Sequence, residues 1–243
     1  MVERFASDEH ESLAILASFY AGVNRTEEAL RTWNRVPDEG KNANRAVAEA
    51  IARRLFEQGS FAVASEFARQ SGLDKTARPG AITNGDFETG IKEQNSFLFD
   101  WAISRTDGRS DIGSDSSIAH SGKRSLRALF RAYTKLPFSD IQQTIAVRPG
   151  SRQRIEFWLR TENLRSGSMP TFLFVNGQGQ QILGVTPPFP VGTNDWQKMS
   201  VDIDVPADSE GIRVVSSREP CPAECPLTGI FWLDDFRITE LVS

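Results

Sequence analysis

The feature that most constrains the fold is a change in the spacing of apolar residues near position 80. Over residues 8–73 the chain is rich in Ala, Glu, Arg and Leu, and apolar residues recur at the three- and four-residue spacing of a helix face. Beyond residue 81 they alternate with polar residues, for example over residues 199–205, as in a strand with one buried face. We therefore predict an α+β chain with two domains, a helical segment at residues 1–75 and an antiparallel β-sandwich at residues 81–243.

About eight short strands are predicted in the second domain, and turn-rich segments such as Arg148-Pro149-Gly150 separate them. Such a series favours two packed antiparallel sheets, and no alternation of strands with helices indicates a parallel sheet. The Gly-containing segment 176–179 is interpreted as a hairpin turn and not as a phosphate-binding loop. Expected strands cover residues 125–130, 139–148, 155–159, 170–176, 180–186, 199–205, 211–217 and 229–240.

The helical segment contains a weak internal repeat. Aligning Ala29 with Ala64 gives an offset of 35 residues, and the turn at residues 58–64 resembles the turn between the two helices of a tetratricopeptide repeat. The resemblance covers about two repeats and implies a surface for a protein partner. The alternative is that these helices only cap the β domain.

Two short segments almost 150 residues apart place acidic side chains beside aromatic ones. They are Asn84-Gly85-Asp86-Phe87-Glu88 and Trp232-Leu233-Asp234-Asp235-Phe236. A carboxylate buried among aromatic rings is costly unless it is paired or bound to a cation. The two segments therefore suggest a metal site that joins the first and last strands of the domain.

Together with Phe99-Asp100-Trp101 and residues 121–126, these segments resemble the jelly-roll, galactose-binding-like carbohydrate-binding modules of bacterial polysaccharide-degrading enzymes. The resemblance covers residues 81–243. It implies a jelly roll with a structural calcium ion held by Glu88 and Asp235, together with backbone carbonyls such as that of Lys123. Asp234 and Asp86 lie next to these residues, and the sequence leaves open which carboxylates reach the ion.

Sugars present apolar ring faces and hydroxyls, so proteins bind them with aromatic rings and planar polar side chains. Trp158 with Arg160 is the leading candidate pair, because the alternation along this strand directs both away from the core. Alternatively, Trp158 packs under a loop or against the helical segment. Phe172 is a further candidate, the alternative being that it and Phe174 fill the core. Three other residues are predicted to line the same face: Arg127, Gln142 and Arg213.

The function expected from these patterns is non-catalytic binding of a polysaccharide or oligosaccharide. The alternative is a protein-interaction scaffold of the bacterial envelope, for instance in assembly or export of extracellular polysaccharide. We do not expect an enzyme, because the motifs G-x-S-x-G and H-E-x-x-H are absent and the acidic segments lie between aromatic residues.

Charge and cysteine content indicate which partners and which cellular location to expect. The 28 basic and 32 acidic residues give a net charge of −4, so nucleic acid is not an expected partner. No apolar run reaches the ~18 residues of a membrane span. Cys221 and Cys225, in a proline-rich loop, are predicted to form a local disulfide, the alternative being two free thiols. A disulfide favours a periplasmic or extracellular location, with the export signal outside this chain.

Overall fold

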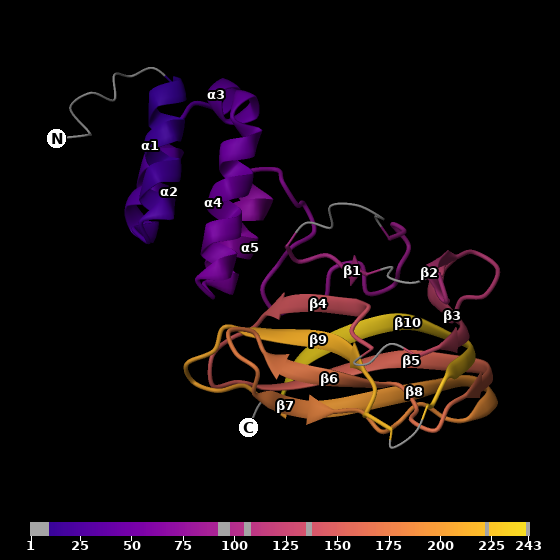
Figure 1. The fold of residues 1–243 in the computed structure, drawn as a ribbon. Helices are drawn as coiled ribbons and strands as arrows, with labels where there is room; N and C mark the ends of the chain where they lie inside the picture. Colours follow the sequence, from indigo (N-terminus) through magenta and orange to yellow (C-terminus); the bar gives the residue numbers. More distant parts are fainter. Residues whose placement is uncertain (1–9, 92–97, 105–107, 135–137, 222–223, 242–243) are drawn as a thin grey trace. The chain divides into compact units, whose positions relative to one another are not determined.

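A computed structural model describes residues 10–91, 98–104, 108–134, 138–221 and 224–241 of the chain. Residues 1–9 of the predicted helical segment therefore lie outside the described residues. The chain divides into two compact units, residues 1–79 and 80–243 (Figure 1), and we describe each by itself. The helical spacing of apolar residues over residues 8–73 and their alternation over residues 199–205 thus predicted helices followed by strands, in the correct order.

The first unit contains five helices. The four longer helices bury apolar residues in the interior of this unit, where Leu16, Tyr20, Ile51 and Leu55 are almost completely inaccessible to solvent. The helices are α1 (His10–Gly22), α2 (Thr26–Asn34), α3 (Asp38–Ala43), α4 (Arg45–Glu57) and α5 (Phe61–Gln70).

The 35-residue offset relates buried positions of this unit. It pairs Leu16 with Ile51, Tyr20 with Leu55, and Ala29 with Ala64, and all of these residues are buried. The likeness to tetratricopeptide repeats stays a prediction, since two helix pairs with a common burial pattern also occur in unrelated helical bundles. None of the described helices has the length and apolar character needed to span a membrane.

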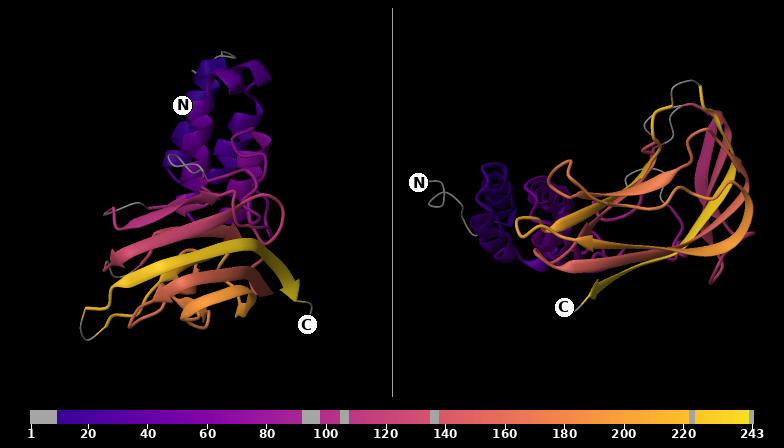
Figure 2. Two further views of the ribbon diagram at one scale, coloured as in Figure 1. Left: turned by 90° about the vertical axis from the view of Figure 1, so that its right-hand side faces the viewer. Right: turned by 90° about the horizontal axis from the view of Figure 1, so that it is seen from below.

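The second unit is a sandwich of two antiparallel sheets with five strands each, which is the architecture of a jelly roll. Sheet A has the order β1-β4-β9-β6-β7, and sheet B has the order β2-β3-β10-β5-β8. Both layers are visible in Figure 1 and in the view from below in Figure 2. Sheet A consists of β1 (Ala102–Ile103), β4 (Ile141–Ala146), β6 (Thr171–Asn176), β7 (Ile182–Val185) and β9 (Gly211–Ser217). Sheet B consists of β2 (Ser110–Asp115), β3 (Ser125–Tyr133), β5 (Arg152–Arg165), β8 (Gly192–Asp204) and β10 (Leu227–Leu241).

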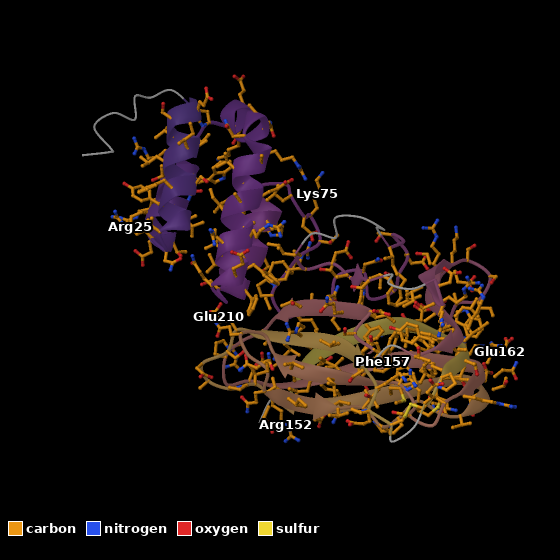
Figure 3. The ribbon with its side chains drawn as sticks, in the orientation of Figure 1. Arg25, Lys75, Arg152, Phe157, Glu162 and Glu210 are labelled. Atoms are coloured by element: carbon orange, nitrogen blue, oxygen red, sulfur yellow. A yellow bond between two sulfur atoms is a disulfide. The ribbon has the colours of Figure 1, made fainter. Side chains whose placement is uncertain are left out.

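Aromatic rings fill much of the space between the sheets. Phe157 of β5, labelled in Figure 3, stacks on Phe236 of β10 with ring centroids 4.5 Å apart, and Phe172 of β6 meets both rings edge-on. Each buried phenylalanine contributes about 1.5–3 kcal/mol from removal of its apolar surface from water. The inward positions follow the period of two, so each strand has one face toward the core and one outer face.

Candidate functional site

Both acidic segments contact one loop, residues 118–124, which lies between β2 and β3. The Oε1 atom of Glu88 accepts hydrogen bonds from the backbone N–H groups of Lys123 and Arg124, at 2.7 and 2.8 Å. On the other side, Asp235 accepts hydrogen bonds from the hydroxyl of Ser121 at 3.0 Å and lies 2.7 Å from Nδ1 of His120. Segments separated by almost 150 residues are thus joined through adjacent residues of a single loop. The metal site that the sequence pattern suggested between them stays a prediction.

Asp234 is fully buried, and its carboxylate accepts hydrogen bonds from backbone N–H groups. Its Oδ2 atom accepts the N–H groups of His120 and Ser121, and its Oδ1 atom accepts the N–H of Asp235. Burial raises the pKa of Asp234, and these three hydrogen bonds oppose that increase only in part. Its hydrogen-bonding capacity is therefore largely used to hold the loop against β10.

Asp235 and Glu88 are held in the ionised form. Burial acts to raise the pKa of Asp235, but the hydrogen bonds with His120 and Ser121 outweigh it, and the net pKa is lowered. The pKa of Glu88 is lowered by the backbone N–H groups of Lys123 and Arg124. Two anionic carboxylates therefore flank the Ser121–Gly122 step of the loop.

The backbone is strained where these segments meet. Phe87 and Asp235 have positive φ values of 54° and 51°, a region that costs residues with a side chain about 1–3 kcal/mol. The aromatic packing stabilises this arrangement, since Phe87 contacts both Trp101 and Phe236, and the indole N–H of Trp101 donates to the carbonyl of Asn84. Phe87 and Phe236, the phenylalanines of the two acidic segments, therefore belong to the core.

The oxygen atoms near this loop are suited to calcium, which binds carboxylate and carbonyl oxygens. Within the described part of the chain, however, no group of three or more His, Cys, Asp and Glu side chains is gathered as a metal site. Asp86 is exposed, and its carboxylate accepts the N–H of Glu88. Any ion here would need backbone carbonyls, such as that of Lys123, besides the carboxylates of Glu88 and Asp235.

Trp158 lies on the outer face of sheet B, and the loop covers it. The His120 ring stacks on the indole with a centroid distance of 3.9 Å and an interplanar angle of 16°, and Trp196 meets the His120 ring edge-on. The covered ring surface is not available for a sugar. The structure thus favours the alternative prediction, in which Trp158 packs under a loop.

The candidate residues do not share one sheet face, so the prediction that Arg127, Gln142 and Arg213 lie together is wrong. Arg127 of β3 and Arg160 of β5 lie on the outer face of sheet B, whereas Gln142 of β4 and Arg213 of β9 lie on sheet A. A period of two shows that residues face outward but not which of two sheets a strand joins.

The prediction of Phe172 as a ligand contact is also wrong. The exposed fractions of Phe172 and Phe174 are both 0 %, so these two side chains face the core. Leu173, which lies between them in the strand, faces outward. Phe172 packs among Phe157, Phe189 and Phe236 in the core.

The outer face of sheet A, which we call the sheet A face, carries polar and aliphatic side chains, most of which are at least partly exposed. The register places Arg213 between Thr144 and Val175, and places Val215 between Gln142 and Leu173. No hydrogen bond or ion pair of its polar side chains to another described residue is found. The polar members of the sheet A face are Gln142, Thr144, Thr171, Arg213 and Ser217, and its apolar members are Leu173, Val175, Ile182, Val185 and Val215.

Sequence reasoning missed several residues of these two regions. His120 directly precedes the quoted residues 121–126 and Ser121 is the first of them, and only their contact with Asp235 in space shows the role of these two side chains. Thr144 and Ser217 face the same side as Gln142 and Arg213, and the period of two along each strand was a usable signal for them.

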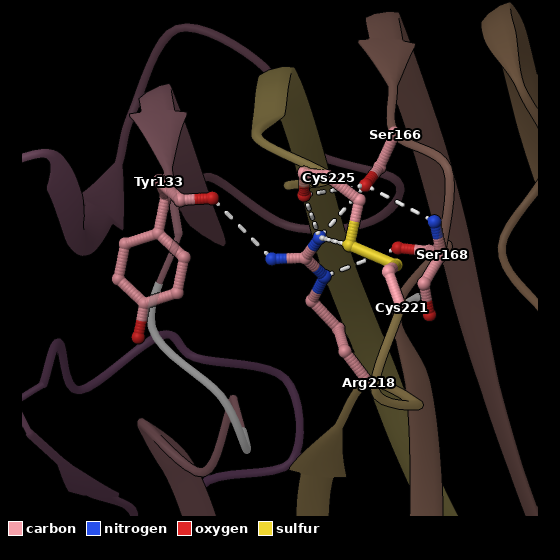
Figure 4. Close-up of a disulfide and its surroundings, with 6 residues drawn as sticks. All are labelled: Tyr133, Ser166, Ser168, Arg218, Cys221 and Cys225. Atoms are coloured by element: carbon pink, nitrogen blue, oxygen red, sulfur yellow. Dashed lines mark hydrogen bonds between the residues drawn. A yellow bond between two sulfur atoms is a disulfide. The ribbon is translucent and has the colours of Figure 1, made fainter. Parts of the chain in front are cut away.

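The predicted disulfide between Cys221 and Cys225 is present. Figure 4 shows it beside Arg218, whose guanidinium is buried and donates hydrogen bonds to the carbonyl of Cys225 at 2.5 Å and to Ser166 Oγ at 2.7 Å. The same group donates to the carbonyls of Ser168 and Tyr133. Burial lowers the pKa of Arg218. The disulfide loop therefore helps to enclose a buried cation.

Comparison with known proteins gave no matching family model and no matching curated protein. Solved structures similar to this chain include "CBM4 structure and function", at 16% identity and a TM-score of 0.48, covering 66% of this chain and 99% of that chain. A second is the structure of TmCBM61 in complex with beta-1,4-galactotriose, at 18% identity and a TM-score of 0.42, covering 65% and 96%. A third is the CBM22-1-CBM22-2 tandem domain from Paenibacillus barcinonensis Xyn10C, at 23% identity and a TM-score of 0.44, covering 68% and 51%. At these identities and TM-scores, no ligand can be carried over from those proteins to this chain.

Proposed function

We propose that the β-sandwich is a non-catalytic carbohydrate-binding module and that the ligand lies on the sheet A face. The observation that carries the proposal is that five polar side chains project from this face without a partner among the described residues. Gln142 and Arg213 are planar groups suited to sugar hydroxyls, and Thr144 can both donate and accept a hydrogen bond. Leu173 and Val215 lie between them and offer apolar contact to the C–H faces of sugar rings.

The sheet B face supports the proposal less well. The ring of Trp158 is stacked under His120, and Trp232 is buried with its indole N–H donating to Asp115 at 2.8 Å. Arg160 lies 5.9 Å from the centroid of the Trp232 ring and 3.4 Å from Asp195. The aromatic and planar groups of this face are thus already engaged with one another.

Affinity electrophoresis in gels that contain single polysaccharides tests this proposal. We expect retardation by at least one polysaccharide, and at least tenfold weaker binding for Gln142→Ala combined with Thr144→Ala. Ser200→Ala, an exposed position on β8 of the other sheet, is the matched control and should bind like the wild type. Equal binding by the double variant and the wild type would place the ligand elsewhere.

We also propose a structural calcium ion held by Glu88 and Asp235 with backbone carbonyls of the loop. Support comes from two ionised carboxylates on either side of one loop step, because calcium prefers such oxygen ligands. Asp234 is left out of the set, since three backbone N–H groups already occupy its carboxylate.

Calcium binding is tested by thermal unfolding in calcium and in chelator. Calcium at a hundredfold excess over Kd should add about 2.7 kcal/mol to the free energy of unfolding. Glu88→Gln should lose most of this gain. An unfolding curve that is the same in calcium and in chelator would contradict the calcium proposal. It would not bear on the proposal that the sheet A face binds a carbohydrate.

The alternative of a protein-interaction scaffold stays a prediction. Helix α1 exposes Ile15 and Phe19, and Val23 directly follows its last residue, at exposed fractions of 59%, 52% and 49%. These residues have the four-residue spacing of one helix face. Nothing in the described residues shows what covers them.

A further inference from the structure

Basic side chains near the middle of the two outer sheet faces differ in their partners. On the outer face of sheet B, five basic side chains of β3, β5 and β8 each have an acidic partner among the described residues. The pairs are Arg127 with Asp111, Arg152 with Asp204, Arg154 with Asp202, Arg160 with Asp195, and Lys198 with Glu156. A ligand approaching that face would have to break these pairs.

The sheet A face has one charged residue among those placed on it, Arg213. Its side chain is half-buried, its Nε atom is shielded from solvent, and it makes no hydrogen bond or ion pair with any described residue. Its neighbours in register, Thr144 and Val175, are neutral. A partly desolvated cation without a counter-charge is unfavourable, so an anion from outside the chain would gain more here than at an already paired arginine.

The rest of the face restricts the kind of anion. Gln142, Thr144 and Ser217 supply neutral hydrogen-bonding groups near Arg213, and the apolar contacts come from aliphatic and not aromatic side chains. Ring stacking, which binds neutral sugars on many surfaces, is therefore not provided by the residues placed on this face. An arginine guanidinium, in contrast, matches the geometry of a carboxylate or sulfate through two parallel hydrogen bonds.

We propose that the sheet A face selects acidic polysaccharides and that Arg213 binds their carboxylate or sulfate group. This inference rests on the proposed function, since it names the class of polysaccharide for the same face. The guanidinium pairs with the oxyanion, and Gln142 and Thr144 contact neighbouring hydroxyls. Binding should weaken as the salt concentration rises, because salt screens an exposed charge pair.

Affinity electrophoresis of the full chain in four gels tests the inference. Two gels contain the acidic polymers polygalacturonate and dextran sulfate, and two contain the neutral polymers xylan and galactan. We expect retardation in at least one acidic gel, at least tenfold weaker binding for Arg213→Gln, and partial retention of affinity for Arg213→Lys. Arg152→Gln removes a paired arginine from the other sheet, at a surface position labelled in Figure 3, and should bind like the wild type.

The two acidic gels distinguish the source of the anion, since polygalacturonate carries carboxylates and dextran sulfate carries sulfates. Retardation in the neutral gels alone would overturn the acidic class and leave the proposed sugar-binding function in place. Retardation in no gel would overturn both proposals. Acidic binding that Arg213→Gln does not weaken would overturn the assignment to Arg213, provided that the unfolding transition of this variant matches that of the wild type.

Discussion

The disulfide should stabilise the chain by more than its loop length implies, because it holds a hydrogen-bond acceptor of Arg218. Cys221 and Cys225 are separated by four positions, so the bridge closes a loop of five residues. Restricting so short a loop in the unfolded chain contributes about 2 kcal/mol. The carbonyl of Cys225 also accepts a hydrogen bond from the buried guanidinium of Arg218, and a bond to a charged group contributes about 1.5–3 kcal/mol.

Replacement of both cysteines by serine should therefore lower the free energy of unfolding by about 3.5 kcal/mol, the sum of about 2 kcal/mol for the loop and about 1.5 kcal/mol for the hydrogen bond. The same replacement in an Arg218→Met background should cost only the loop term, about 2 kcal/mol. A urea-denaturation double-mutant cycle measures the difference, which is the coupling between the disulfide and the arginine.

The cycle has a clear refuting result. If the cysteine replacement costs the same in both backgrounds to within about 0.5 kcal/mol, the disulfide and Arg218 act independently, as uncoupled sites do. Arg218→Met removes a buried charge and leaves the carbonyls of Ser168 and Tyr133 without their donor. Its own destabilisation, about 3 kcal/mol, cancels in the cycle.

Three further predictions concern the loop that joins the acidic segments. Trp158→Ala should lower the free energy of unfolding by about 2 kcal/mol through loss of the His120 stacking and leave polysaccharide affinity unchanged, as measured by urea denaturation and gel retardation. Gly122→Ala should destabilise by about 2 kcal/mol in the same denaturation assay, because Gly122 has a φ of 61° and an added Cβ would lie 2.4 Å from Glu88 Oε1. The lowered pKa values of Glu88 and Asp235 mean that their stabilisation is present above the unfolded-state pKa near 4 and is lost as pH falls through the folded-state values; thermal unfolding between pH 6 and pH 2 should show this loss, and Glu88→Gln should reduce it.

The sequence predicted the fold better where the strands are long. Alternation identified the strands that contain Phe157 and Ile203, because each has several consecutive in-and-out positions. It missed β1 and β2, since β1 has only two residues and β2 reads Ser-Asp-Ile-Gly-Ser-Asp with a single buried position, Ile112. Short or polar edge strands acquire their structure from pairing with a neighbour and not from their own pattern.

The acidic segments stood out in the sequence because a carboxylate buried among aromatic rings is costly unless it is paired or bound to a cation. The sequence therefore suggested a metal site between the segments, whereas in the structure the buried Asp234 accepts three backbone hydrogen bonds. Its partners, the backbone N–H groups of His120 and Ser121, carry no comparable signal, since every residue except proline has such a group. The sequence thus indicated that a buried carboxylate needs a partner, but not which groups provide it.

The proposed ligand face was harder to predict, because the evidence for it is an arginine that lacks an acidic partner. Arg127, Arg160 and Arg213 are equivalent in sequence, each an arginine at an outward strand position, and only the arrangement of strands gives the first two an acidic neighbour. The loop that holds His120 covers Trp158 on the outer face of sheet B, and the core separates this face from the sheet A face. The residues that hold this loop and the residues proposed to bind a ligand therefore lie on opposite sheets. We expect substitutions of the unpaired Arg213 to change ligand preference at little cost in stability, because no described residue depends on its side chain for a hydrogen bond or ion pair.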